Sequence, residues 1–495
     1  MPIISLFSAI TLLASTPAGI GQAGPDPDSK AALEEIKAQT LSQSPAYAYV
    51  QELSDTFGPR LTGSVQAAKA CEWAEQKMKG IGLKNVHLEP WHLSHGWQRG
   101  RAFAQLTAPF RLDLNITSYG WVGSTKAGGV DADVALVNDD QLGEEIKRHA
   151  ASWRGKVLLL APLGPTHKNG IRTYSELGGL LTAAAKAHAV AVISAAGRPG
   201  VMLTHTGPAL FYDSYVPIPV VDIAAEHQKM LVRLLTQKKT VRMKIDVENE
   251  VTAGSVMSPN VVGEIPGFEH PEEVVLLCAH IDSWDLATGA VDDGEGVAAV
   301  LGAANAILVE HVRPRRTIRF VLFTGEEEGL LGSLAYVRTH KAEMKNVVAS
   351  FAIDWGAGPI TKIPLAGREE LEPAYRHFTQ LVADLGDIQV DHTYLLFTDA
   401  YSFTLAGIPG VALLQNSPDY STIGHSAADT LDKVDKKNLI QNTAFLACIS
   451  FWSANYPNRL SKPWTPAATE AALIRDNQRT MLQLFSLWPF VAPRR

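Results

Sequence analysis

The chain has 495 residues, of which 46% are hydrophobic and 19% charged, and its formal net charge at pH 7 is -7. This composition is typical of a globular protein with two or three domains and excludes a chain that is mainly disordered. Because phosphate binding requires clustered lysine and arginine, and the sequence has no long basic run, we expect no nucleic-acid partner.

The first 23 residues are typical of a secretory signal peptide, although they lack the basic residues that usually begin one. An apolar run from Ile3 to Ala14 is followed by small residues at Gly21 and Ala23, as at a cleavage site. A bilayer-spanning helix needs about 20 apolar residues, and neither this run nor any later one is that long. We therefore predict a secreted or periplasmic protein without stable membrane insertion.

The three cysteines, Cys71, Cys278 and Cys448, are an odd number and have no metal-site spacing. Cys278 and Cys448 lie in apolar runs, where a thiol usually packs in the core. We expect a fold that does not depend on disulfide bonds.

The segment before residue 125 has helical periodicity over 46–57 and 64–81, where Gly82 ends the second helix, and strand-like alternation over 86–91. The pattern changes between about 125 and 250. Here short apolar strands alternate with an alanine-rich helix: strands 130–137, 155–160, 189–194 and 216–221, and helix 177–188. Because few residues of catalytic type cluster in this block, we interpret it as an inserted, lid-like domain.

Strands and helices alternate from about residue 251 onward. The predicted strands are 274–279, 317–324, 347–353 and 410–414, and the predicted helices are 296–309, 330–339, 371–385 and 436–452. Such alternation predicts an α/β fold with a mixed, mostly parallel sheet sandwiched by helices. A final amphipathic helix over 469–487 either packs on its own domain or forms a homodimer contact.

Five residues of metal-ligand type fall at or after the ends of these strands: His280, Asp292, Glu327, Asp354 and His425. In a parallel sheet, ligands bind beyond the carboxyl ends of the strands. Two imidazoles and three carboxylates suit two Zn²⁺ ions that share a carboxylate and a water molecule. Three carboxylates leave two dications with a net charge of about +1, which hydroxide cancels. The sequence therefore predicts a hydrolase.

Each of these positions also has an ordinary interpretation when taken alone. His280 could be a structural histidine, Asp292 a helix cap and His425 a loop residue. Their joint occurrence favours the metal site, and two further acids support it. Asp282 is placed to accept a hydrogen bond from the far imidazole nitrogen of His280. Glu326, beside Glu327, is placed to take a proton from the attacking water.

Several motifs together resemble the M28 family of di-zinc exopeptidases, and within it the plasma glutamate carboxypeptidase branch. These motifs are 57–64 (FGPRLTGS), 280–285 (HIDSWD), 289–294 (GAVDDG), 313–317 (RPRRT), 326–333 (EEEGLLGS) and 425–430 (HSAADT). The resemblance implies one zinc on His280, Asp292 and Asp354 and a second on Asp292, Glu327 and His425. It also implies that Glu326 is the general base and acid. Related sequences often have histidine or tyrosine before the last ligand, where this chain has Gly424.

The resemblance also implies an inserted domain of protease-associated type, and so suggests a division of the whole chain. We expect a signal peptide (1–23), an N-terminal part of the peptidase domain (24–124), the inserted lid (125–250), the catalytic part with the metal ligands (251–457) and a C-terminal tail (458–495).

We predict a zinc-dependent exopeptidase that hydrolyses dipeptides or short peptides through a metal-bridging hydroxide and a glutamate base. The alternatives are a di-metal aminoacylase or amidohydrolase on the same scaffold, and a non-catalytic binding protein. Asp285, Asp293 and Glu328 could anchor a free amino terminus, whereas no cation can be assigned to a free carboxylate. The preferred end of the peptide and the replacement of zinc by another metal stay open.

Overall fold

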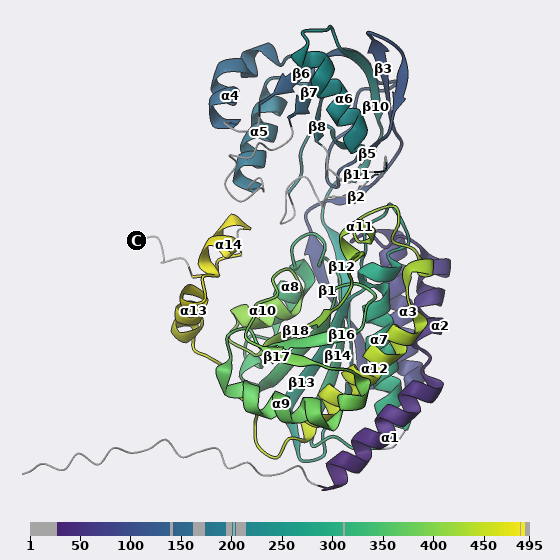
Figure 1. Ribbon diagram of the computed structural model, residues 1–495, viewed down its shortest axis with the longest axis vertical. Coiled ribbons are helices and arrows are strands. Elements are labelled where there is room, and N and C mark those ends of the chain that lie inside the picture. The colour runs from purple at the N-terminus through teal and green to yellow at the C-terminus, as the bar shows by residue number, and fades with distance from the viewer. Residues whose placement is uncertain are drawn as a thin grey trace, which may run out of the picture.

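A computed structural model describes residues 27–138, 142–161, 174–194, 200, 203, 214–309, 312–485 and 487–490. Within these ranges the chain forms two eight-stranded sheets and one two-stranded ribbon. Figure 1 shows the two large sheets in separate lobes that are stacked along the long axis. The predicted signal peptide, residues 1–23, lies outside the described residues.

The sheet of the lobe that carries the candidate metal ligands is mixed, with four parallel strands at its centre. Its order is β1 (Lys84–Leu93), β12 (Val256–Ile265), β14 (Arg316–Phe323), β13 (His270–His280), β15 (Val347–Ile353), β18 (Gly410–Gln415), β16 (Ile360–Pro364) and β17 (Gln389–Asp391). Strands β14, β13, β15 and β18 run parallel to one another, whereas β1 and β12 pair with their neighbours in antiparallel fashion. Strand β16 is antiparallel to β18 and parallel to the edge strand β17. The predicted mixed α/β sheet is confirmed.

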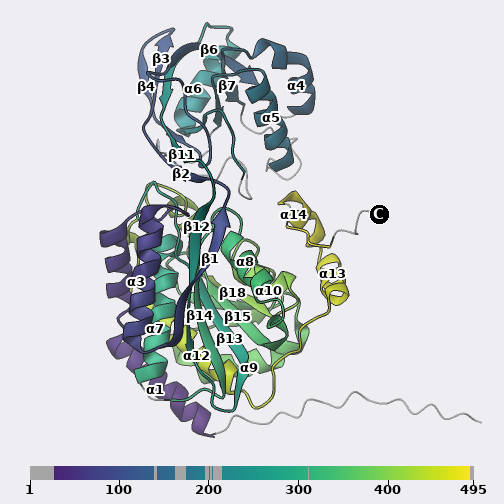
Figure 2. The same ribbon diagram turned by 180° about the vertical axis from the view of Figure 1, so that it is seen from behind.

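Helices cover both faces of this sheet because the side chains of its buried central strands alternate between two apolar cores. Val275 and Leu277 of β13 pack in the core that contains α1 (Pro27–Gln43), α2 (Ala46–Glu52), α3 (Val65–Ile81), α7 (Glu295–Val309), α9 (Glu372–Leu381) and α12 (Lys436–Asn455). Leu276 and Cys278 point to the opposite core, which contains α8 (Leu331–Thr339) and α10 (Ala400–Leu405). Figures 1 and 2 show α3 and α7 on one side of the sheet and α8 and α10 on the other.

Local sequence signals explain where these helices begin and end. The Ser64 side chain accepts a hydrogen bond from the amide of Ala67 at the start of α3, as an N-cap residue does. Gly82 ends the same helix with a φ of 104°, a conformation that glycine adopts without strain. Helix α12 begins in the same way, since Asp435 accepts from the amide of Asn438.

The second lobe contains the inserted segment, which we define as residues 99–249. Its sheet has the order β4 (Leu112–Leu114), β3 (Ala102–Ala108), β10 (Arg242–Val247), β6 (Val130–Val137), β7 (Val157–Leu160), β8 (Ala191–Ser194), β9 (Val220–Ile223) and β5 (Ile116–Ser118). Three of these strands, β3, β4 and β5, precede residue 125, where we expected the insertion to begin. Two of the three have only three residues each, which is too short for a clear alternation of polar and apolar residues.

Helices and a ribbon complete the second lobe. The helices are α4 (Leu142–His149), α5 (Tyr174–Lys186) and α6 (Ala225–Thr236). The ribbon pairs β2 (Gly96–Gln98) with β11 (Glu250–Thr252). Because the chain enters the insertion after β2 and leaves it before β11, this ribbon forms the connection between the lobes (Figure 1).

The C-terminal tail folds as two short helices instead of the single helix that we expected over 469–487. Helix α13 (Pro466–Arg475) and helix α14 (Arg479–Leu484) are separated at Asn477, whose φ is 58°. Leu473, Leu482 and Leu487 of the tail pack against Leu330 and Tyr401. In the described residues the tail therefore packs on its own lobe.

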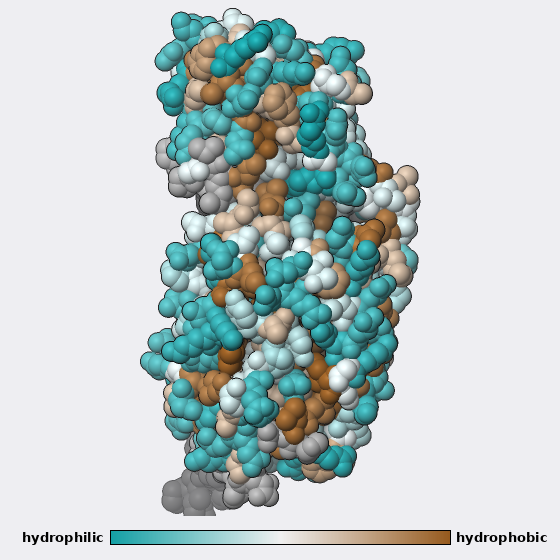
Figure 3. Space-filling model, turned by 90° about the vertical axis from the view of Figure 1, so that its right-hand side faces the viewer, coloured by the Kyte–Doolittle hydropathy of each residue, from teal (hydrophilic) through white to brown (hydrophobic). Residues whose placement is uncertain are grey.

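Within the described part of the chain, every helix is too short or too polar to cross a bilayer. The face drawn in Figure 3 is mostly polar, with its apolar residues in small groups. All three cysteines are buried and free of disulfide bonds, and Cys278 and Cys448 are the core thiols that we predicted.

Candidate metal centre

The parallel strands bring the candidate ligands to one edge of the sheet that contains β13 and β15. His280 ends β13, Asp354 directly follows β15, and Glu327 lies in the loop after β14. Asp292 lies in the turn that leads into α7, and His425 follows α11 (Tyr420–Ile423), which comes after β18. Because neighbouring parallel strands end at the same edge, residues that are up to 145 positions apart converge, from His280 to His425.

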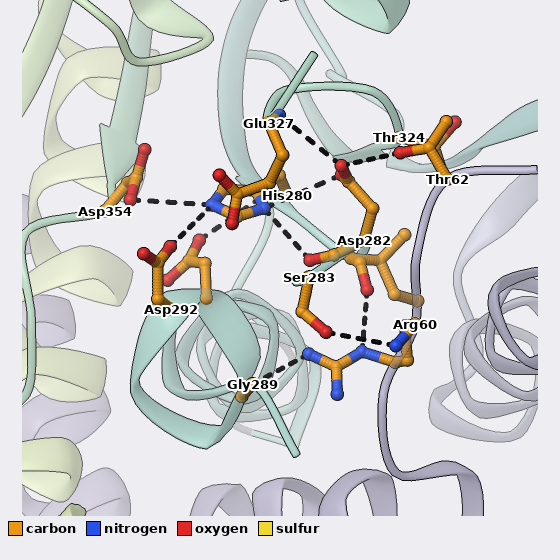
Figure 4. Close-up of polar contacts among 12 residues, drawn as sticks. Arg60, Thr62, His280, Asp282, Ser283, Gly289, Asp292, Thr324, Glu327 and Asp354 are labelled. Atoms are coloured by element: carbon orange, nitrogen blue, oxygen red, sulfur yellow. Dashed lines mark hydrogen bonds and ion pairs between the residues drawn. The ribbon is translucent and has the colours of Figure 1, made fainter. Parts of the chain in front are cut away.

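The five residues form two groups that share Asp292. In the first group, Nε2 of His280 lies 3.2 Å from Oδ1 of Asp292 and 3.5 Å from Oδ1 of Asp354. In the second, Nε2 of His425 lies 3.1 Å from Oδ2 of Asp292 and 3.0 Å from Oε2 of Glu327. Figure 4 shows Asp292 and Asp354 on the same side of the His280 ring, each with its carboxylate pointing toward it. Asp292 therefore presents one carboxylate oxygen to each group.

The chemistry of these groups fits divalent cations. Nε2 of His280 and Oε1 of Glu327 are buried without a hydrogen-bond partner among the described residues, and a buried polar atom normally has one. Burial raises the pKa of Glu327 to about 7, with His425 acting in the opposite direction. Burial lowers the pKa of His280, but Asp354, Asp282 and Asp292 together raise it well above its ordinary value. A bound cation would compensate this concentration of carboxylates, and imidazole with carboxylate is a donor set that zinc accepts.

Asp282 supports His280 through two of its atoms. Nδ1 of His280 lies 3.1 Å from the backbone oxygen of Asp282 and 3.6 Å from its Oδ1. The main-chain oxygen is therefore the nearer acceptor, although we expected the carboxylate to fill this role. Oδ2 of Asp282 accepts a hydrogen bond of 2.8 Å from the hydroxyl of Thr62 (Figure 4). It also lies 3.5 Å from the amide nitrogen of Glu327, so Asp282 contacts both strand ends.

Glu326 lies in the sharp turn between β14 and α8. The turn passes through Gly325, whose φ is 78°, and a Cβ there would lie 2.6 Å from the ring of Trp91. Only glycine fits this position. The Glu326 side chain is buried, and its pKa is raised well above the ordinary value by burial and by the charge of Asp354. A carboxyl group with a raised pKa beside the candidate ligands suits a residue that exchanges protons.

Three further residues at the site were not identified from the sequence. Arg60 is fully buried, and its guanidinium donates to the backbone oxygens of Ile281 and Gly289, at 2.7 and 2.8 Å. The Asp429 carboxylate accepts hydrogen bonds from the backbone of the Asp292 turn. Tyr420 donates a hydrogen bond of 2.8 Å to Oδ2 of Asp292. Arg60 and Asp429 lie inside motifs that we quoted for the family resemblance, whereas Tyr420 has no signal in the sequence.

The three acids that could anchor a free amino terminus are all engaged or buried. Asp285 forms an ion pair with Arg99, with Nη2 at 2.7 Å from Oδ1. Asp293 accepts hydrogen bonds from the amides of His280 and Gly296. Glu328 is 2% exposed, and burial raises its pKa well above the ordinary value. None of the three therefore presents an open carboxylate to a peptide.

The inserted segment contacts the loops that carry the candidate ligands. Trp97 of the ribbon and Trp121 of the inserted segment form an aromatic cluster with Trp284, which lies four residues after His280. A second contact involves the loop that carries His425. The backbone oxygen of Leu203 lies 3.4 Å from the amide nitrogen of Ala427, two residues after His425. The inserted segment therefore lies beside the candidate metal centre.

Comparisons with known proteins agree with this fold and site. The model of peptidase family M28 matches residues 260–449. Human carboxypeptidase Q is 30% identical to the chain over 454 residues, which cover 88% of this chain and 94% of that protein. The chain therefore belongs to peptidase family M28, and it is a metallopeptidase. The expected family is confirmed.

Solved structures place the fold in the same family. The crystal structure of a peptidase M28 precursor from Shewanella amazonensis has a TM-score of 0.77 and 30% identity, and the match covers 89% of this chain and all of that one. The crystal structure of a zinc aminopeptidase from Bacillus subtilis has the same fold, with a TM-score of 0.65 and 22% identity. This match covers 85% of this chain and 97% of the aminopeptidase chain.

Proposed function

We propose that this metallopeptidase is an exopeptidase that binds two zinc ions per chain and hydrolyses dipeptides or short peptides. The observation that carries the proposal is the position of Asp292, whose two carboxylate oxygens lie 3.2 and 3.1 Å from Nε2 of His280 and of His425. A carboxylate in this position is placed to bridge two cations.

The ligands divide into two sets in this proposal. His280, Asp292 and Asp354 would hold one zinc ion, and Asp292, Glu327 and His425 would hold the other. Zinc at such a site polarises a carbonyl group and lowers the pKa of water to about 7. The hydrogen bond from Nδ1 of His280 to the backbone oxygen of Asp282, 3.1 Å long, would leave the Nε2 lone pair available to a metal ion.

Glu326 transfers the proton in this reaction. Its carboxylate takes a proton from the attacking water molecule and then donates it to the nitrogen of the departing amine. Its burial and its position next to Glu327 support this role. A group with a raised pKa holds the proton between these two steps.

We propose that the inserted segment limits the enzyme to short substrates. Contacts at Trp284 and at Ala427 hold it beside both ligand loops. In this proposal the segment blocks the path of a long peptide that would extend past the scissile bond. We also propose that residues 1–23 direct export of the protein.

Replacing Glu326 with glutamine tests the mechanism. We expect Glu326→Gln to keep the zinc content of the wild type while turnover of a dipeptide set falls by about 100-fold or more, since general acid–base catalysis contributes about 10² to 10⁴. Glu72→Gln removes the same charge from the exposed face of α3 and serves as the control. Wild-type turnover in Glu326→Gln would remove Glu326 from the mechanism.

The same substrate set tests the exopeptidase assignment. Comparing free dipeptides with N-blocked and C-amidated versions shows which terminus the enzyme requires. Hydrolysis of N-acyl amino acids without cleavage of any free dipeptide would contradict the peptidase proposal and favour an aminoacylase.

A further inference from the structure

Tyr420 places a hydroxyl group directly at the candidate metal centre. It is the first residue of α11, which Figure 1 shows at the edge of the peptidase lobe that faces the inserted segment. Its hydroxyl donates a hydrogen bond of 2.8 Å to Oδ2 of Asp292, the carboxylate that both candidate groups share. The ring lies against Trp355, with ring centroids 6.1 Å apart, and Trp355 directly follows the candidate ligand Asp354.

Gly424 makes room for this ring. A Cβ at residue 424 would lie 2.8 Å from Cε2 and 2.9 Å from Cζ of Tyr420, closer than carbon atoms can approach without displacement. The backbone of Gly424 does not itself require glycine, because its φ of -56° and ψ of 144° suit any residue. Residue 424, next to His425, must therefore be a glycine for the Tyr420 ring to occupy its position.

We propose that Tyr420 is a catalytic residue that donates a hydrogen bond to the oxygen of the scissile carbonyl as that oxygen gains negative charge. The inference rests on the proposed peptidase function and adds a residue to it. A hydroxyl hydrogen rotates about its C–O bond, so the same donor turns from Asp292 to a substrate oxygen bound beside it. The phenol keeps its proton throughout, and only its acceptor changes.

Two arginine side chains near the site already have other acceptors, and the hydroxyl of Tyr420 is a suitable donor. Arg60 donates to the backbone oxygens of Ile281 and Gly289, and Arg99 is paired with Asp285. A preorganised donor at the developing oxyanion contributes about 10² to 10³ in turnover. Tyr420 supplies such a donor from a ring that Gly424 and Trp355 hold in place.

Removing only the hydroxyl tests the role. In Tyr420→Phe we expect the zinc content per chain to equal that of the wild type, kcat for the fastest dipeptide of the set to fall about 100-fold, and KM to change little. Affinity for a phosphinic dipeptide analogue, which has tetrahedral geometry and a negative oxygen, should fall by a similar factor, because the donor acts on that oxygen. Tyr47→Phe, on α2 with its ring against Lys436, is the matched control and should behave as the wild type.

A second variant displaces the hydroxyl while residue 420 stays a tyrosine. Gly424→Ala adds a methyl group that must push the ring aside, so we expect the same loss of kcat and of analogue affinity with zinc retained. In the double variant Tyr420→Phe/Gly424→Ala the two losses should not add, because both remove the same donor. Additive losses would overturn the proposal.

The remaining outcomes separate the possible failures. If Tyr420→Phe loses zinc and excess zinc restores its turnover, Tyr420 only positions Asp292 and the catalytic role is wrong. If the wild type cleaves dipeptides and Tyr420→Phe does so equally well, the inference fails while the proposed function stands. If the wild type cleaves no peptide, both fail.

Discussion

The carboxylate of Asp429 fixes the backbone of Asp292. Oδ2 of Asp429 accepts a hydrogen bond of 3.2 Å from the amide of Asp292, and Oδ1 accepts one of 2.7 Å from the amide of Val291. Asp429 is buried and lies four residues after His425. The loop that carries one candidate histidine therefore also orients the carboxylate that the two groups share.

Replacing Asp429 with asparagine should weaken metal binding while leaving all five candidate ligands in the sequence. The amide group of asparagine has one acceptor oxygen and a donating NH₂ group, so one of the two backbone amides loses its acceptor. Loss of a residue that orients a metal ligand typically costs 10- to 100-fold in affinity. Competition with a zinc chelator measures this change. Unchanged zinc affinity would show that the Asp292 turn keeps its geometry without the Asp429 carboxylate.

Replacing Thr62 with valine should destabilise the fold around Asp282. The hydroxyl of Thr62 donates a hydrogen bond of 2.8 Å to Oδ2 of Asp282, and both residues are fully buried. Valine has the same shape but leaves the carboxylate without this donor, and an unsatisfied buried polar group costs about 1–3 kcal/mol. Chemical denaturation measures the free energy of unfolding. Thr236→Val on the exposed end of α6 is the control, and an equal effect in both variants would contradict the prediction.

Much of the peptidase lobe could be predicted from the sequence because its central strands are buried on both faces and read as continuous apolar runs. The strand predicted over 347–353 has the bounds that the structure shows, and the predicted end of a helix at Gly82 is observed. Helix α1 over Pro27–Gln43 and strand β12 were not predicted. Helix α1 is rich in polar residues and has a weak apolar face, so periodicity does not reveal it.

The supporting residues of the metal centre could not be predicted, because their roles depend on contacts between distant parts of the chain. The metal-ligand types are few and chemically distinctive, so His280, Asp292, Glu327, Asp354 and His425 could be named in advance, and the structure brings them together. The roles of Arg60, Thr62, Asp429 and Tyr420 depend on contacts across the fold, such as the 128 positions between Tyr420 and Asp292. No local pattern encodes such contacts.

The ion pair between Arg99 and Asp285 should couple the inserted segment to the peptidase lobe. Nε and Nη2 of Arg99 lie 2.9 and 2.7 Å from Oδ1 of Asp285, and both side chains are largely buried. Removing one partner leaves a charge in a poorly hydrated position, which costs up to about 3–5 kcal/mol in fully buried pairs. We expect Arg99→Gln and Asp285→Asn each to lower the melting temperature clearly.

A double-mutant cycle isolates the coupling of this pair. The double variant should lose less stability than the two single losses added together, with a coupling energy of about 1–3 kcal/mol. The exposed pair of Lys147 and Glu144 on α4 provides the control, since surface pairs contribute about 0–1 kcal/mol. A coupling energy near zero for Arg99 and Asp285 would show that this ion pair does not help to hold the two lobes together.

Glu295 should make the stability of the protein depend on pH between about 4.5 and 8. It is 2% exposed at the start of α7, and Oε1 accepts a hydrogen bond from Gln415. Burial raises the pKa of Glu295 from 4.5 to about 8, and the charges of Asp429 and Asp435 add to this effect. In that window the unfolded chain has lost the proton while the folded protein keeps it, so the free energy of unfolding falls as the pH rises.

Glutamine resembles the protonated acid and removes this titration. We expect Glu295→Gln to differ little from the wild type at pH 4.5 and to be more stable at pH 8.5. A pKa shift of this size corresponds to a gain of up to about 5 kcal/mol. Melting temperatures of both proteins across the window measure the difference, and the exposed Glu72→Gln variant should show no such trend. Because the folded state keeps its proton only up to about pH 8, the difference should stop growing above that pH. A difference that is constant from pH 4.5 to 8.5 would show that Glu295 is already ionised in the folded protein.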